Sequence, residues 1–236
     1  MTMRNLLYAA FAISVLIAPF SMVSTNAMQN DSQASKSDNV TFYKVPLECP
    51  AAPAIGCGSR AKPVLLDLEG KPIVKQAWLD RQGKILAIVW KEATAGAGRT
   101  AVIVALRKTH NLAVEELSGG ARDTALQSFR SGGGWHRGAD VDRLSEEEAG
   151  VITDRLMRRV IDKAPTISAK AELVRPIMAD MIRDCLVGSP DQSSARCRET
   201  FRDDLLAAVG DHLSRVETDA LLEATKAGFR PVAGER

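Results

Sequence analysis

The stretch VLLDLEGKPIVKQAWLDRQGKILAIVW, residues 64–90, contains three apolar runs separated by two turn sequences. The runs are residues 64–68, 73–79 and 84–90, and the turns are 69–72 and 80–83. Short apolar runs bounded by Gly, Pro and Asp are typical of strands joined by tight turns. We therefore predict a small three-stranded antiparallel sheet. Because the third run is apolar on both faces, we expect both of its faces to be covered.

The residues around this stretch divide the chain into segments of different composition. Residues 28–39 lack aromatic and branched apolar side chains, so they are predicted to form a disordered tether. Residues 40–98 are predicted to contain a disulfide loop and the sheet. Within them, four prolines between residues 45 and 63 argue against a regular helix and favour a structured loop. Residues 99–236 are predicted to be a helical region, which makes the fold class α+β.

Several helices are predicted in the second half of the chain. Residues 101–106, AVIVAL, suit either a buried strand or the start of a helix continuing to residue 117, and we favour the helix. A short helix over 121–130 should end at the glycines 132–134.

Three or four longer helices should form a C-terminal bundle. Ser145 and Glu148 resemble a capping box for the first, and Ser214 and Glu217 for the last. The expected ranges are 144–165, 168–187 with a kink at Pro176, 191–216, and a final helix ending near Gly228.

The N-terminus has the features of an export signal. Arg4 is the only charged residue of the first 27, residues 6–20 are almost wholly apolar, and residues 25–27 are small. An uncleaved membrane anchor is the alternative, because residues 6–23 have about the length of a minimal span. We favour a cleaved signal peptide over 1–27. The mature protein is then expected in the bacterial periplasm or secreted, without a stable membrane span.

Charge and motifs exclude several classes of function. The chain has 31 basic and 29 acidic residues, a net charge of +2, so we expect no nucleic-acid partner. It contains no Gly-x-Ser-x-Gly, His-Glu-x-x-His or dinucleotide-binding sequence. We attribute the acidic run 146–148 to the helix dipole. We therefore assign no catalytic residue and no cofactor, and favour a protein that is not an enzyme.

Four cysteines provide the main chemical interest. In an exported protein an even number of cysteines favours disulfides, and proximity favours Cys49–Cys57 and Cys185–Cys197 among three possible connectivities. The second bridge would join two helices. For Cys49 and Cys57 a redox or soft-metal site is the alternative, because nearby cations would lower the pKa of Cys57. Their spacing is not that of a Cys-x-x-Cys site.

A few other side chains are candidates for binding. For a metal they are Cys49, Cys57 and His136, and for a ligand they are Arg60, Lys62, Trp135, His136 and Arg137. Trp135 alternatively packs against the bundle. We predict an exported, non-enzymatic binding or accessory protein whose partner is another periplasmic protein or a small ligand. The alternative is a thiol–disulfide redox or soft-metal-handling protein centred on Cys49 and Cys57.

Overall fold

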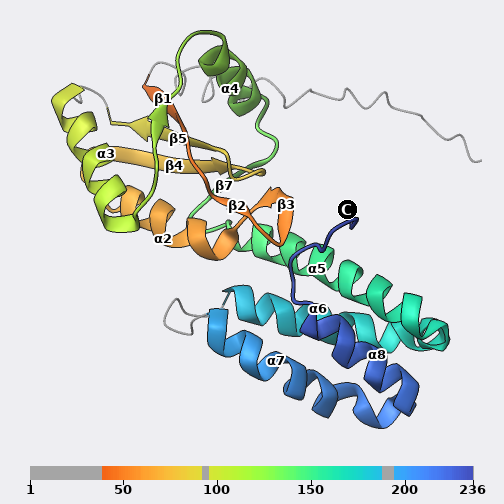
Figure 1. Ribbon diagram of the computed structural model, residues 1–236. Coiled ribbons are helices and arrows are strands. Elements are labelled where there is room, and N and C mark those ends of the chain that lie inside the picture. Colours follow the sequence, from red (N-terminus) through yellow and green to blue (C-terminus); the bar gives the residue numbers. More distant parts are fainter. Residues whose placement is uncertain (1–38, 92–95, 188–193, 236) are drawn as a thin grey trace, which may run out of the picture. The chain divides into compact units, whose positions relative to one another are not determined.

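The computed structural model describes residues 39–91, 96–187 and 194–235, with side chains of 194–199 excepted (Figure 1). The predicted signal peptide and all but the last residue of the tether lie outside these ranges, so export stays a prediction. No helix within the ranges is long and apolar enough to cross a membrane. The elements, with η for a 3₁₀ helix, are β1 (Val40–Lys44), β2 (Glu48–Cys49), β3 (Ala52–Gly56), α2 (Gly58–Glu69), β4 (Val74–Asp80), β5 (Ile85–Trp90), α3 (Gly96–His110), β6 (Glu115–Glu116), α4 (Gly119–Ser131), β7 (Trp135–Arg137), α5 (Asp142–Lys163), η1 (Pro165–Lys170), α6 (Ala171–Val187), α7 (Ser194–Val209), η2 (Gly210–His212) and α8 (Arg215–Lys226).

The main sheet has five antiparallel strands in the order β6-β1-β5-β4-β7, and β2 and β3 form a separate hairpin. Apart from the β2–β3 hairpin inserted after β1, the succession β1-α2-β4-β5-α3-β6 is that of a split βαβ sheet. The α+β fold class is confirmed, whereas the expected three-stranded sheet is too small. β6 and β7 join it from the segment predicted to be helical.

Residues 64–68 form part of α2, so the strand predicted there is wrong. Ala61, Val64, Leu65 and Leu68 are all buried, and their spacing of three and four residues is that of one helix face. Pro63 lies inside this helix, contrary to the expectation that the prolines exclude one. β1 supplies the missing strand and pairs with β5 from Val40 opposite Val89 to Lys44 opposite Ile85.

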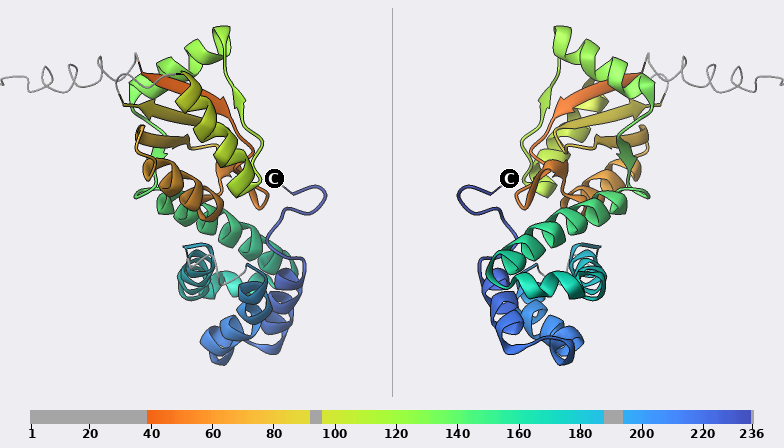
Figure 2. Two further views of the ribbon diagram at one scale, coloured as in Figure 1. Left: turned by 90° about the vertical axis from the view of Figure 1, so that its left-hand side faces the viewer. Right: turned by 90° about the vertical axis from the view of Figure 1, so that its right-hand side faces the viewer.

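β5 is covered on both faces, as predicted. Leu86, Ile88 and Trp90 belong to the core that includes α2 and α3, whereas Ala87 and Val89 pack in the smaller core with α4. The two helix layers are visible in the side views (Figure 2). The β4–β5 hairpin is also confirmed, with Trp78 opposite Ala87.

The helix ends match the predicted ends where the sequence signal lies within a few residues of the end. Residues 101–106 are helical, but α3 ends at His110, followed by Asn111 at a φ of 46°, rather than reaching residue 117. α4 ends as predicted, at Gly132 with a φ of 77°. The Ser214–Glu217 capping box at the start of α8 is confirmed.

α5 is the element that the sheet and the C-terminal helices share. It contacts α2 and β3 on one side, and α6 and α8 on the other. It begins at Asp142, so the predicted capping box of Ser145 and Glu148 is wrong. Both residues lie inside the helix and are buried, because α2 and the β2–β3 hairpin pack over that turn. Residues 188–193, which include the predicted end of α6, lie outside the described ranges.

Candidate functional site

Two thiols and a carboxyl group meet where the β2–β3 hairpin, α2 and α5 come together. Cys49 is the last residue of β2, Cys57 immediately precedes α2, and Glu148 lies in the second turn of α5. The Cys49 thiol donates a hydrogen bond to Glu148 Oε1 at 2.7 Å and lies within hydrogen-bonding reach of Cys57. All three side chains are buried.

Backbone hydrogen bonds hold the two sulfur atoms in place. The amides of Ala51 and Ala52 donate to Cys49 Sγ at 3.2 and 3.3 Å, which fixes the turn of the hairpin around the sulfur. The amide of Cys57 donates to the Leu47 carbonyl at 2.7 Å and ties the start of α2 to the hairpin. The two cysteines are therefore positioned by backbone that is itself hydrogen-bonded.

Cys57 has the environment of a thiolate. The hydrogen bond from Cys49 lowers its pKa most, burial opposes this, and hydrogen bonds from Ser59 and the Arg60 amide together with the Arg60 charge lower it further. Cys57 is also the N-cap residue of α2, where the helix dipole favours negative charge. The hydrogen bonds outweigh burial, and the pKa of Cys57 falls below that of an ordinary thiol.

Cys49 and Glu148 are perturbed in the opposite direction. The pKa of Cys49 is raised by its hydrogen bond to Cys57, by burial and by the nearby Glu148 charge. Burial and the Cys57 charge raise the pKa of Glu148 to about 7, while the hydrogen bond from Cys49 lowers it. The Cys49 thiol carries a single proton, and both Glu148 and Cys57 are neighbours that can accept a hydrogen bond from it. The geometry thus favours a thiolate at Cys57, a thiol at Cys49, and a carboxyl group that changes its charge near neutral pH.

The cluster opens into a cavity of about 360 Å³. Besides Cys49, Cys57 and Glu148, its walls include cationic side chains from α2 and the C-terminal segment. Apolar side chains come from the hairpin turn, α5, α6 and the C-terminal segment. Among the residues that line the cavity are Pro50, Arg60, Ile152, Leu186, Phe229 and Arg230. Cys49 and Cys57 thus line the wall of a cavity, although both residues are largely buried.

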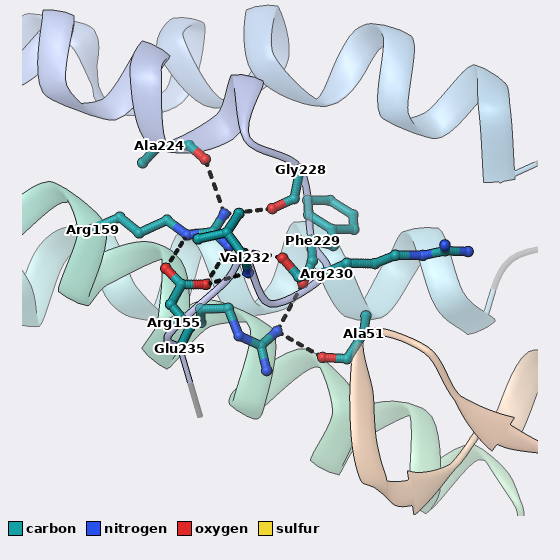
Figure 3. A network of polar contacts seen from close by, with 9 residues as sticks. All are labelled: Ala51, Arg155, Arg159, Ala224, Gly228, Phe229, Arg230, Val232 and Glu235. Carbon is teal, nitrogen blue, oxygen red and sulfur yellow. Dashed lines mark hydrogen bonds and ion pairs between the residues drawn. The ribbon is translucent and has the colours of Figure 1, made fainter.

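The C-terminal segment 227–235, here called the strap, is held against α5 by two buried arginines (Figure 3). Arg155 Nη1 donates to the carbonyls of Ala51 at 2.6 Å and Phe229 at 2.7 Å. Arg159 donates to the Gly228 and Arg230 carbonyls and forms a two-pronged ion pair with Glu235. Arg155 thus joins the turn that carries Cys49 to the strap.

The predicted Cys49–Cys57 disulfide is not formed in this structure, because both residues are free thiols. Both cysteines nonetheless line the wall of one cavity, as a site formed by the pair would require. Cys185 lies on α6, is half-buried and has an interaction partner. The side chain of Cys197 lies outside the described residues, so the Cys185–Cys197 bridge stays a prediction.

The other candidate residues are dispersed. Arg60 lines the cavity, whereas Lys62 forms an ion pair with Asp142 at 2.6 Å. Arg137 pairs with Glu69 at 2.9 Å. Trp135, His136 and Arg137 form the short strand β7, and residues 132–134 and 138–141 on either side of it lie outside helices and strands.

Trp135 and His136 lie on β7, away from the cavity walls. Trp135 is buried, with its ring centroid 5.2 Å from that of Phe129, so it packs in the core between the sheet and α4 and not against the bundle as the alternative expected. The Nε2 atom of His136 is buried without a hydrogen-bond partner, and burial lowers the pKa of the imidazole. His136 does not line the cavity with Cys49 and Cys57. Across the described ranges, no group of three or more His, Cys, Asp or Glu side chains is arranged as a metal site.

Glu148 is the site residue that the sequence analysis missed, because the acidic run was attributed to the helix dipole. The sequence around Glu148 does contain a pattern that marks this residue. Leu144, Glu148 and Ile152 follow one another at four-residue intervals and are all buried, so Glu148 interrupts an apolar helix face. A carboxylate on such a face is costly unless it is paired or protonated, which marks it as a functional candidate.

No known protein family, curated protein or solved structure matches this chain. The geometry and the pKa shifts of the site are therefore the basis for inferring the function. The relevant features are two free thiols that line one cavity, one of them with a lowered pKa, and a buried carboxyl group hydrogen-bonded to the other.

Proposed function

We propose that this chain is a thiol–disulfide exchange protein, with Cys57 as the nucleophile, Cys49 as the second thiol and Glu148 as its proton acceptor. The observation that carries the proposal is the 2.7 Å hydrogen bond from the Cys49 thiol to the buried Glu148, next to a Cys57 thiol of lowered pKa. The hydrogen bond favours the redox alternative over a binding protein that carries out no reaction. A purely structural disulfide loop does not require a buried carboxyl group beside one of its sulfur atoms.

The first step uses the acidity of Cys57. Its thiolate attacks one sulfur of a substrate disulfide, the substrate S–S bond breaks, and a mixed disulfide with Cys57 forms. The other half of the substrate leaves as a thiolate. A lowered pKa makes Cys57 reactive near neutral pH, because the thiolate and not the thiol is the nucleophile.

The second step uses Cys49 and Glu148. The ionised Glu148 takes the proton from the Cys49 thiol, and the new thiolate attacks the Cys57 sulfur of the mixed disulfide. The second half of the substrate leaves as a thiolate, and a Cys49–Cys57 disulfide remains. The substrate has gained two electrons and the protein has lost two. The reverse sequence oxidises a dithiol, and the relative reduction potentials decide the direction.

Binding of a soft metal ion is the second candidate, because two free thiols line the same cavity. Metal binding by thiols requires both to lose their protons. The raised pKa of Cys49 opposes that loss, whereas exchange needs Cys49 to ionise only once the mixed disulfide has formed. The asymmetry between the two thiols therefore favours exchange.

Trapping of the mixed disulfide tests the proposal. Reduced protein is mixed with hydroxyethyl disulfide, a small neutral substrate, and the products are identified by mass spectrometry. We expect the native chain to end with a Cys49–Cys57 disulfide. Cys49→Ser should accumulate a mixed disulfide at Cys57, and Cys57→Ser should react at least tenfold more slowly. Equal reactivity of the two variants would contradict the assigned roles.

The same reduced protein serves for the metal alternative. Cu(I) is added under anaerobic conditions to the native chain and to both cysteine variants. Stoichiometric binding that requires both Cys49 and Cys57, together with no measurable exchange, would replace the proposal with metal handling. Exchange at the expected site supports the proposal whether or not copper also binds.

A further inference from the structure

We propose that the substrate is a small disulfide carrying carboxylate groups. This inference rests on the proposed exchange function and adds the class of substrate. Its basis is two exposed arginines, Arg60 and Arg230, that line the cavity of Cys49 and Cys57. A carboxylate-bearing disulfide could present its sulfur atoms to Cys57 while its charged groups bind these guanidinium groups.

The two arginines come from separate parts of the chain. Arg60 lies in the first turn of α2, three residues after Cys57. Arg230 belongs to the strap, and its side chain extends away from the Arg155 and Arg159 network (Figure 3). Only its backbone takes part in that network, through the carbonyl that accepts a hydrogen bond from Arg159 at 2.8 Å.

Neither guanidinium group is used by the fold. The buried Arg155 and Arg159 both donate to backbone carbonyl groups, and Arg159 also pairs with Glu235. By contrast, no acidic side chain within the described ranges forms an ion pair with Arg60 or Arg230. A planar guanidinium donates two parallel hydrogen bonds to a carboxylate, so both groups suit an anionic ligand.

The charges around the cavity favour the same ligand. Glu148 is the one acidic side chain among the described lining residues, and its pKa of about 7 leaves it protonated much of the time near neutral pH. The Cys57 thiolate then shares the cavity with two arginines, of which Arg60 acts directly on its charge. Two arginines beside one thiolate give a locally positive entrance, which attracts anions and repels cations.

The size of the cavity favours a small molecule. Its volume of about 360 Å³ is near the lower end of the range typical of small-molecule sites, about 300–1,000 Å³. Pro50, Ile152, Leu186 and Phe229 supply apolar walls against which a short aliphatic chain can pack. A compact disulfide with terminal carboxylates matches these walls and the two arginines.

A series of disulfides with different charges tests the inference. The reduced protein is mixed with oxidised glutathione, hydroxyethyl disulfide or cystamine, which are anionic, neutral and cationic. Each rate is divided by the rate of the same disulfide with a free low-molecular-weight thiol at the same pH, which removes intrinsic reactivity. We expect the normalised rate to be at least tenfold higher for the anion than for the cation, and high salt to reduce this ratio.

Two variants and a control locate the effect. Arg230→Ala should lower the anion-to-cation ratio several-fold with little change for the neutral disulfide, because Arg230 has no role at Cys57. Arg60→Ala should lower the ratio and also slow all three reactions, because Arg60 helps to lower the pKa of Cys57. Arg130→Ala, which removes an exposed arginine of α4 that does not line the cavity, should leave the ratio unchanged.

The outcomes distinguish a failure of the anionic-substrate inference from a failure of the proposed exchange function. Equal normalised rates for all three disulfides, or a ratio unaffected by Arg60→Ala and Arg230→Ala together, would overturn the anionic substrate and leave exchange intact. The absence of reaction with every disulfide would instead overturn the exchange function.

Discussion

Burial gives Glu148 its chemical behaviour. An ordinary glutamate is ionised at neutral pH, but Glu148 is 2% exposed, and its pKa is raised to about 7. Its partner is the thiol of Cys49, which is a weaker hydrogen-bond donor than a cation. A group of this kind can accept a proton near neutral pH and return it, which the second exchange step requires.

Glu148 should make stability depend on pH. Its pKa is higher in the folded protein than the ordinary value of 4.5, so the folded state binds the proton more tightly. The resulting stabilisation is complete below about pH 4.5 and is lost as the pH rises to about 7, a change of at most about 3 kcal/mol. Glu148→Gln should remove it. Denaturant unfolding of reduced protein at several pH values measures the difference between the two curves.

Glu147→Gln is the matched control for this measurement. Glu147 adjoins Glu148 but is only partly buried, and its carboxylate pairs with Arg81 at the surface. Surface pairs contribute little, so its curve should follow that of the native chain within about 1 kcal/mol. If Glu148→Gln also followed the native curve from pH 4.5 to 7, the assignment of a raised pKa would be wrong.

The hydrogen bond from Cys49 should control the acidity of Cys57. Cys49→Ala removes the donor that lowers the pKa of Cys57 most, whereas Cys49→Ser keeps a hydroxyl donor. The pH midpoint of iodoacetamide labelling at Cys57 should therefore rise in Cys49→Ala and rise less in Cys49→Ser. Mass spectrometry assigns the label to Cys57. Identical midpoints in both variants and the native chain would contradict this control.

At the scale of elements, a glycine sets the distance between α2 and α5. A Cβ atom at Gly58 would lie 2.2 Å from Ser145 Oγ and 2.9 Å from the Val141 carbonyl oxygen. Because one contact is with backbone, a side-chain movement alone cannot relieve the overlap. Gly58 follows Cys57 directly, so this close approach places the nucleophile beside the helix that carries Glu148.

Gly58→Ala should separate the two helices and disturb the site. We expect a loss of about 1–3 kcal/mol in the free energy of unfolding, as for other overpacked contacts, and slower exchange with hydroxyethyl disulfide. Gly150→Ala on α5 is the control, because a Cβ there meets no atom within 4 Å. It should keep the exchange rate and leave stability equal or slightly higher, owing to better helix propensity. Native stability and exchange in Gly58→Ala would show that α2 and α5 can move apart without consequence.

At the scale of the whole molecule, Arg155 connects residues that are remote in the sequence. It bonds the carbonyl of Ala51, 104 residues earlier, and that of Phe229, 74 residues later. The cavity walls near Cys49 and near the strap therefore depend on one buried side chain. Figure 3 shows Arg155 between these two backbone segments.

Arg155→Met should leave both carbonyls without their donor while keeping most of the side-chain volume. The expected loss is about 2–4 kcal/mol in the free energy of unfolding, since buried unpaired polar groups are costly. Arg158→Met replaces an exposed arginine of the same helix and should change stability by less than about 1 kcal/mol. Thermal and denaturant unfolding provide the measurements. Equal losses in the two variants would mean that the bridge to Ala51 and Phe229 contributes little.

Local sequence signals predicted a substantial part of the fold. The turn at residues 80–83 indicated the β4–β5 hairpin, the glycines at 132–134 the end of α4, and Ser214 with Glu217 the start of α8. Each of these features depends on residues within a few positions of one another. The error at residues 64–68 has a different origin, because a short apolar run suits a strand or a buried helix equally well. The packing of α2 against β4 and α5 decides for the helix.

The sequence by itself determined the α+β class, the helical second half and the chemical interest of Cys57, because Ser59 and Arg60 lie two and three residues after it. Only the tertiary structure decided that Glu148, 99 residues from Cys49, accepts its hydrogen bond, and that Arg230 from the strap lines the same cavity. Periodicity and capping report contacts within a few residues. A buried proton acceptor and a shared cavity depend on which distant elements pack together, and that depends on the fit of whole surfaces.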